Sequence, residues 1–231
     1  DNLVKVCEEK NINHIIFTSS VAVYGFTKPN TDESGPFNYY NDYGRTKYEA
    51  EKIYQKWYEK DPEIRTLTII RPTVVFGERN RGNVYNLIKQ INSGLFLQIG
   101  DGNNIKSMAY VENVAAFIEY AIKNFKGLNV FNYVDKPDLT TNELIKFVRD
   151  NIKYSPKLNI RLPFLLGYIG GAFFDLLSSI TGKEYPISRI RIKKFCATTQ
   201  FSTSIPQKTN FNPPVTIFEG LERFIKYDFL K

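Results

Sequence analysis

The most informative residues in the sequence are Tyr43 and Lys47, which stand four positions apart. On a helix this spacing places both side chains on one face, about one turn apart. An isolated phenol ionises only near pH ~10, but a neighbouring ammonium stabilises the phenolate and lets a tyrosine act as a base closer to neutral pH. Taken alone the spacing is common, and a half-buried tyrosine beside a solvated lysine would also produce it. The surrounding sequence therefore has to decide.

Ser20 supplies a hydroxyl that can meet the same substrate atom. The run 14–18 is rich in β-branched and aromatic residues, which predicts a buried parallel strand that ends at the small polar residues Ser19 and Ser20. Ligands of open α/β sheets bind at the carboxyl ends of the strands. We therefore expect Ser20 and Tyr43 to converge on one oxygen of a substrate.

The elements that must position these residues alternate between strand and helix, which predicts a parallel sheet covered by helices on both faces. The helix that carries Tyr43 and Lys47 is expected at 42–58, after a loop at 25–41. The other expected elements are a helix at 2–9, a strand at 66–70, a helix at 83–92, a strand at 106–111, a helix at 112–123, a strand at 130–133 and a helix that begins at Thr140.

The composition excludes several classes of function. With 231 residues, 42% of them hydrophobic, the chain is long enough to bury a substantial core. The formal charge of +7 is scattered apart from a short basic run at 189–194, which favours an anionic small substrate over nucleic acid. Two distant cysteines, Cys7 and Cys196, and a single histidine, His14, predict no metal site and a reduced, cytoplasmic protein.

The most apolar segment spans residues 162–180. Asp175 and three glycines interrupt it, and its length is marginal for a membrane span. We expect a lid, a core helix or a partner-facing helix there, with association of the protein with a membrane as the alternative.

Three motifs follow one another in the first part of the chain. They are Phe17-Thr18-Ser19-Ser20-Val21-Ala22-Val23-Tyr24-Gly25, Tyr43-Gly44-Arg45-Thr46-Lys47 and Arg71-Pro72-Thr73-Val74-Val75-Phe76-Gly77. In residues, order and spacing they resemble the motifs of the extended short-chain dehydrogenase/reductases, and in particular the NAD-dependent nucleotide-sugar epimerase/dehydratase family. The resemblance runs from residue 1 to about Ala121, with a looser match beyond.

The resemblance implies NAD(P)-dependent epimerisation or oxidoreduction of a nucleotide-sugar through a keto intermediate. It makes Tyr43 the catalytic acid/base, gives Lys47 the task of stabilising the phenolate and holding the nicotinamide ribose, and lets Ser20 bond the reacting hydroxyl. Hydride leaves a sugar carbon for NAD and returns to the other face of the keto-sugar, so that the cofactor is regenerated in each cycle. NADP is not excluded, because the determinant of that choice lies outside the matching motifs.

The resemblance also implies cofactor contacts at two strand ends. Thr18 matches a position near the cofactor, and the end of the next strand lies beside the nicotinamide. A structural role competes at both places, since Pro72 can merely terminate a strand and Thr18 can satisfy the backbone. The expected cofactor-binding residues are Thr18, Tyr43, Lys47, Pro72, Thr73 and Val74.

The substrate diphosphate is expected to meet Asn83 and Lys106. Similar epimerases have an asparagine near the diphosphate at the start of this helix, and many members carry an arginine where this chain has Lys106. A lysine lacks the bidentate fork of an arginine, and Asn83 could simply cap its helix. The expected substrate-binding residues are Ser20, Tyr43, Asn83 and Lys106.

The fold implied by the resemblance is α/β, a Rossmann-like doubly wound parallel sheet that lacks its N-terminal strands, with a smaller, mostly helical C-terminal lobe. The sequence has no glycine-rich pyrophosphate-binding turn after a first strand, so we expect the chain to be the catalytic and C-terminal part of a longer protein. Residues 1–135 are assigned to the sheet domain, with substrate-lobe segments interleaved from about 78, and residues 136–231 mainly to the C-terminal lobe. A homodimer is expected.

Two other functions stay open. The apolar segment at 162–180 would suit a hydroxysteroid-type dehydrogenase, and the missing glycine-rich turn would suit a non-catalytic nucleotide-binding or regulatory protein. Dehydratase chemistry is disfavoured, because Val21 and Ala22 stand where similar dehydratases place an Asp-Glu pair.

Overall fold

The chain forms two compact units, each assembled from segments that are distant in the sequence. The computed structural model describes residues 2–94, 96–152, 160–183, 185 and 187–230. The predicted division of the chain at residue 135 stays a prediction. Unit 1 contains Asp1–Gly77, Ser107–Pro137 and Gln200–Leu221, and unit 2 contains Glu78–Lys106, Asp138–Thr199 and Glu222–Lys231.

Unit 1 is built on a sheet of three parallel strands. Strand β2 (Thr66–Pro72) lies between β1 (His14–Thr18) and β6 (Leu128–Tyr133). The register pairs Thr18 with Ile70. Every residue of β2 is buried, as expected for the central strand of a parallel sheet that is covered on both faces. The strands expected at 14–18, 66–70 and 130–133 are confirmed.

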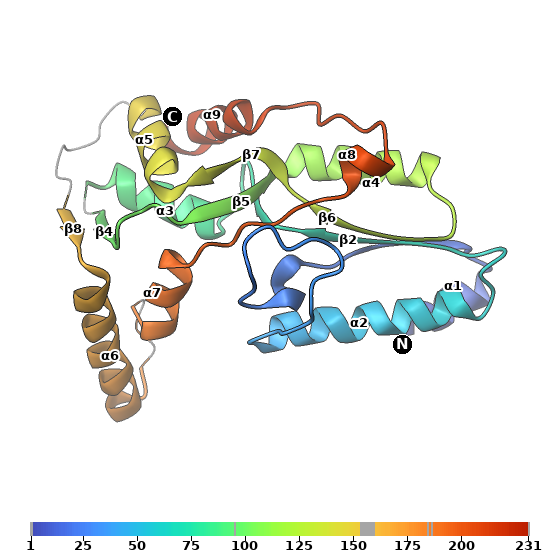
Figure 1. The fold of residues 1–231 in the computed structure, drawn as a ribbon, viewed down its shortest axis with the longest axis horizontal. Helices are drawn as coiled ribbons and strands as arrows, with labels where there is room; N and C mark the ends of the chain where they lie inside the picture. The colour runs from blue at the N-terminus through green and yellow to red at the C-terminus, as the bar shows by residue number, and fades with distance from the viewer. Residues whose placement is uncertain (1, 95, 153–159, 184, 186, 231) are drawn as a thin grey trace. The chain divides into compact units, whose positions relative to one another are not determined.

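Helices cover both faces of this sheet, with α1 (Asn2–Glu9) and α2 (Asp42–Glu59) on one face and α4 (Val111–Asn124) on the other (Figure 1). Adjacent side chains of a strand point to opposite faces. Accordingly, Ile69 belongs to the apolar cluster that α1 and α2 share, whereas Ile70 belongs to the cluster that α4 covers. The parallel α/β architecture predicted from the alternation of elements is confirmed.

Further elements of unit 1 follow the strands of this sheet. A 3₁₀ helix, η1 (Val21–Tyr24), comes directly after β1, and a short helix, α8 (Ile205–Lys208), belongs to the third segment of the unit. A second sheet has the order β3 (Val74–Phe76), β5 (Ile105–Tyr110) and β7 (Asp135–Thr140), in which β3 and β5 run parallel. Residues 105–106 of β5 and 138–140 of β7 belong to segments of unit 2.

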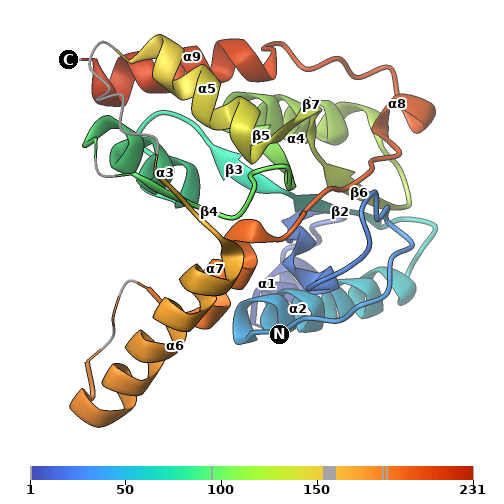
Figure 2. The same ribbon diagram turned by 60° about the vertical axis from the view of Figure 1, so that its left-hand side comes forward.

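Unit 2 is mainly helical. In the described part of this unit, the short strands β4 (Leu97–Ile99) and β8 (Ile160–Leu162) pair in parallel, and Figure 2 shows α6 (Phe164–Thr181) lying beside α7 (Arg189–Cys196). Thr140 and Glu143 form the capping box that the sequence predicts at the start of α5. The helix α9 (Ile217–Phe229) runs from the third segment of unit 1 into unit 2. Unit 2 also contains α3 (Asn83–Asn92) and α5 (Thr141–Asn151).

A buried ion pair fastens α2 to the central strand of unit 1. The guanidinium of Arg71 donates to both carboxylate oxygens of Glu51, from Nε to Oε1 at 2.9 Å and from Nη2 to Oε2 at 2.6 Å. The two side chains are only 2% and 1% exposed. Burial opposes the charge on Arg71, but the hydrogen bonds and the negative charge of Glu51 outweigh it, and the pKa of Arg71 is raised.

Arg71 also orders the segment that follows β1. Its Nη1 donates to the hydroxyl of Tyr24 at 2.6 Å, and that hydroxyl donates to Oδ1 of Asn132 in β6 at 2.9 Å. Burial raises the pKa of Tyr24 to about 12, so the phenol stays protonated near neutral pH. One guanidinium therefore connects α2, η1 and, through Tyr24, β6.

We predict that Glu51→Gln lowers the free energy of unfolding by about 3–5 kcal/mol, because it removes the negative charge that is paired with the buried guanidinium of Arg71. Urea unfolding of the variant and the parent measures the change. The matched control is Glu49→Gln in the same helix, whose ion pair with Arg45 is half exposed and should contribute less than about 1 kcal/mol. Equal unfolding midpoints for the two variants would contradict the importance of the buried pair.

Candidate active site

Ser20 directly follows β1 and caps η1. Its backbone is extended, and its Oγ accepts a hydrogen bond of 3.1 Å from the N–H of Ala22. The N–H of Ser19 continues the ladder with a bond of 2.7 Å to the carbonyl of Ile70, so Ser20 stands at the carboxyl end of β1 beside the end of β2. The hydroxyl accepts one bond and keeps its own proton, which it can donate to a ligand.

Tyr43 lies in the first turn of α2, and more than half of it (54%) is exposed. Asn41 caps this helix, since its Oδ1 accepts from the N–H of Gly44 at 3.0 Å. A Cβ at Gly44 would come within 2.5 Å of the carbonyl oxygen of Ala22. The glycine after Tyr43 therefore allows the first turn of α2 to lie against the residues that follow Ser20.

Lys47 follows one turn after Tyr43 on the same face of α2. Its Nζ donates to the carbonyl oxygen of Thr18 at 2.8 Å and lies 5.9 Å from the centre of the Tyr43 ring. Thr18, Ser20, Tyr43 and Lys47 therefore gather at the carboxyl end of β1, as expected from the sequence.

The next strand end carries the other expected cofactor residues, Pro72, Thr73 and Val74. Pro72 and Thr73 are buried, and Val74 begins β3. The N–H and the hydroxyl of Thr73 both donate to the carbonyl of Tyr133, at 3.0 and 3.2 Å. These bonds give Thr73 a structural role, and contact of this strand end with a cofactor stays a prediction.

Asn83 and Lys106 belong to unit 2. Asn83 is the first residue of α3 and Gly82 is the N-cap, so the alternative expectation that Asn83 caps this helix is wrong. Nζ of Lys106 donates to the carbonyls of Lys194 and Ala197 at 3.0 and 2.6 Å, and burial lowers the pKa of Lys106 to about 8. Binding of the substrate diphosphate by Asn83 and Lys106 stays a prediction.

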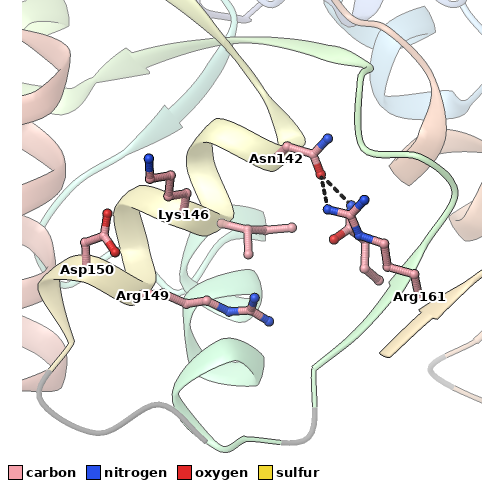
Figure 3. Close-up of a pocket in the computed structure, with 7 residues that line it drawn as sticks. Asn142, Lys146, Arg149, Asp150 and Arg161 are labelled. Carbon is pink, nitrogen blue, oxygen red and sulfur yellow. Dashed lines mark hydrogen bonds between the residues drawn. The ribbon is translucent and has the colours of Figure 1, made fainter. Parts of the chain in front are cut away.

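A polar pocket in unit 2 involves none of the residues expected from the sequence. It has a volume of about 300 Å³. Oδ1 of Asn142 accepts from Gln98 at 2.7 Å and from Arg161 at 3.3 Å, and Figure 3 shows these contacts beside α5. Its lining also contains Lys146 and Arg149. With Arg161 these basic residues outnumber the one acidic lining residue, Asp150, so the pocket suits an anion. Only the spacing of Lys146 and Arg149 along one helix could have indicated it from the sequence.

The support of the candidate site, which is the buried set of Arg71, Glu51 and Tyr24, is not evident from the sequence. One signal was present, because Arg71 is a charged residue directly after a run that reads as a buried strand. A charge in such a place requires a buried partner. Nothing in the sequence identifies Glu51, rather than another acidic residue, as that partner.

Comparison with known proteins adds independent findings. Residues 1–133 match the model of the NAD dependent epimerase/dehydratase family. Over 231 residues the chain is 51% identical to the N-acetyl-alpha-D-glucosaminyl-diphospho-ditrans,octacis-undecaprenol 4-epimerase of Escherichia coli O157:H7. The match covers 99% of this chain and 69% of that protein. The chain is 29% identical to a decarboxylating sterol-4-alpha-carboxylate 3-dehydrogenase of Candida albicans, over 95% of this chain and 67% of that protein.

Among solved structures, the UDP-N-acetylglucosamine 4-epimerase of Methanobrevibacter ruminantium M1, in complex with UDP-N-acetylmuramic acid, is similar with a TM-score of 0.72. The identity is 21%, and the match covers 98% of this chain and 66% of that one. This likeness concerns the fold, and the Rossmann-like α/β class is confirmed. The chain spans about two thirds of the length of the proteins it matches.

We predict that Gly44→Ala lowers the free energy of unfolding by about 1–3 kcal/mol, because the new methyl group collides with the carbonyl of Ala22. The control is Gly170→Ala, also inside a helix but with no atom within 4 Å of the added Cβ. There alanine should stabilise the protein by about 0.5–1 kcal/mol through its higher helix propensity. Denaturant unfolding compares the two, and a stabilising effect at both positions would show that α2 and η1 do not need the close approach.

Proposed function

The chain belongs to the NAD dependent epimerase/dehydratase family, and we propose that the protein inverts C4 of a sugar carried on a diphosphate, through a keto intermediate. The nucleotide-sugar expected from the sequence is a substrate of this kind. One observation carries the proposal, namely the bond from Lys47 to the carbonyl of Thr18, which holds an ammonium beside the exposed ring of Tyr43 and near Ser20.

In the proposed reaction, Tyr43 takes the proton of the sugar hydroxyl as the carbonyl forms and gives it back when the hydroxyl is restored. The ammonium of Lys47 and the positive end of α2 both stabilise the negative charge on the tyrosine oxygen. Ser20 holds the reacting oxygen with its free hydroxyl proton. The four residues at the end of β1 fit the nicotinamide end of NAD, because Lys47 and Thr18 stand at the ligand-binding edge of the sheet. When bound, NAD supplies the hydride acceptor and donor.

A second carrier for the sugar is favoured by a specific observation. The relative with 51% identity is named for a sugar joined through a diphosphate to undecaprenol, which is a lipid. A nucleotide and a polyprenol can present the same sugar diphosphate, and they differ only in the group beyond the second phosphate. The steroid alternative is less favoured, since the sterol dehydrogenase is only 29% identical. Cytoplasmic localisation and a homodimer stay predictions.

We predict that Tyr43→Phe in the full-length protein lowers kcat by roughly a hundredfold or more, because the variant has no hydroxyl to exchange a proton with the sugar. The free energy of unfolding should change by less than about 1 kcal/mol, since the side chain is exposed. The control is Tyr48→Phe, the same substitution five residues further along the same helix, with an expected kcat near that of the parent. Comparable turnover by the two variants would refute the role of Tyr43.

The carrier is tested by supplying the same sugar, N-acetylglucosamine, on UDP and on a polyprenyl diphosphate, with NAD present. Conversion of either compound to its 4-epimer supports the proposed reaction, and the ratio of kcat/KM for the two identifies the carrier. We expect the polyprenyl compound to be preferred by at least about tenfold if the carrier follows the 51% relative, which corresponds to about 1.4 kcal/mol. No conversion of either compound by the folded protein would refute 4-epimerisation of this sugar.

A further inference from the structure

Helix α6 in unit 2 exposes a continuous apolar stripe. At 100° per residue its six members fall within an arc of about 100° along the whole helix, and that arc contains no polar residue. Their exposed fractions range from 55% to 71%. Monomeric soluble proteins seldom leave such a contiguous apolar surface without a function. The stripe consists of Leu165, Leu166, Ile169, Phe173, Leu176 and Ile180.

The opposite face of α6 is packed against its own unit. Gly167 and Gly171 are the buried residues of the helix. A Cβ at Gly171 would come within 2.8 Å of the backbone nitrogen of Arg189 in α7, and a Cβ at Gly167 within 2.5 Å of Cγ2 of Ile99 in β4. Asp175, one turn beyond Gly171, accepts from Nε of Arg189 at 2.8 Å. The helix is thus held by one face, as Figures 1 and 2 show for α6 and α7, and the stripe is on the other.

By length and composition α6 is long and apolar enough to cross a membrane, since its 18 residues reach about 27 Å. Its packing against α7 argues against crossing, because α7 and its basic residues would enter the hydrocarbon with it at a high cost. A helix with one apolar face and one protein-bound face can instead lie in the membrane surface. We propose that α6 docks on an anionic phospholipid bilayer, parallel to its plane, with the stripe inserted among the upper acyl chains.

The charge around α6 suits such a surface. Residues 160–199 contain six basic and two acidic residues, whereas the chain as a whole has 31 basic and 24 acidic residues. Helix α7 lies on the side of α6 opposite the stripe, and packed helices have axes about 8–10 Å apart. With the stripe inserted, the basic residues of α7 stand near the depth of the headgroups. There they attract anionic lipids within a Debye length of about 8 Å.

Charge complementarity also favours a bilayer over a second copy of the chain. A second copy joined at the stripe would bring no negative charge to the basic helix α7, which lies on the far side of α6, whereas anionic headgroups supply that charge. A lipid-linked sugar would be delivered at the same surface, which fits the second carrier considered above. Docking is nevertheless independent of catalysis, so a failed assay of epimerisation would leave this inference intact, and the reverse also holds.

The test is flotation of the full-length protein with vesicles of phosphatidylethanolamine and phosphatidylglycerol in a three-to-one ratio. We expect the parent to float with these vesicles and to bind phosphatidylcholine vesicles more weakly. A triple variant of the stripe, Leu166→Gln, Ile169→Gln and Phe173→Gln, should lower the partition coefficient by roughly a hundredfold or more.

The matched control replaces three apolar residues of unit 1 that are equally exposed. Leu3, Ile64 and Ile122 are 57%, 60% and 58% exposed, and their change to Gln should leave flotation as in the parent. A further variant, Arg191→Gln with Lys193→Gln, should reduce the preference for anionic vesicles by roughly tenfold. Circular dichroism checks that each variant is folded.

The depth of α6 is measured on Phe173→Trp with nitroxide lipids, because the natural Trp57 is buried in unit 1. A label near the headgroup should quench the new tryptophan more than a label near the end of the acyl chain. Stronger quenching by the deep label would overturn the surface orientation in favour of a spanning helix. Membrane docking would be overturned if the parent did not float, or if the stripe and control variants floated equally. It would also be overturned if the parent were a dimer and the stripe variant, but not the control variant, were a monomer.

Discussion

The structure of unit 1 depends above all on the buried contact between Arg71 and Glu51. Tyr43, Lys47 and Glu51 follow one another at four-residue intervals on α2, so the face that presents the proton-transferring pair is anchored through Glu51 to the central strand. The buried guanidinium of Arg71 is paired with a carboxylate of α2, and this contact holds the helix in place against β2. Because a helix is rigid along its axis, the contact between Glu51 and Arg71 also fixes where Tyr43, about two turns away, lies relative to β1.

The sequence predicted the local elements well because each is determined by its own residues. The β-branched runs became the parallel strands, Thr140 and Glu143 formed their capping box, and the helix with Tyr43 and Lys47 began at Asp42 as expected. The motif Tyr43-Gly44 also has a structural role, because the absence of a Cβ at Gly44 allows α2 to approach the turn after Ser20.

What could not be predicted depends on residues that are far apart in the chain. The partner of Arg71, the two carbonyls that bind the ammonium of Lys106, and the anion-suited pocket beside α5 each join segments that a periodicity cannot relate. The apolar run at 162–180 shows the same limit, because composition cannot distinguish a buried helix from an exposed one. The glycines of α6 determine which of its residues are exposed, because they let one face pack against α7 and leave the large side chains on the other face.

The interleaving of the two units has a consequence for how the protein is made. Oε1 of Glu33 accepts from the N–H of Asn132 and from the N–H of Ser204, each at 2.9 Å, and Thr31 forms a parallel bridge with Phe201. These contacts complete unit 1, yet Asn132 and Ser204 leave the ribosome 99 and 171 residues after Glu33. Such high contact order delays folding. Before residue 204 has emerged the carboxyl end of β6 lacks these contacts, and nascent chains should depend on chaperones during that interval.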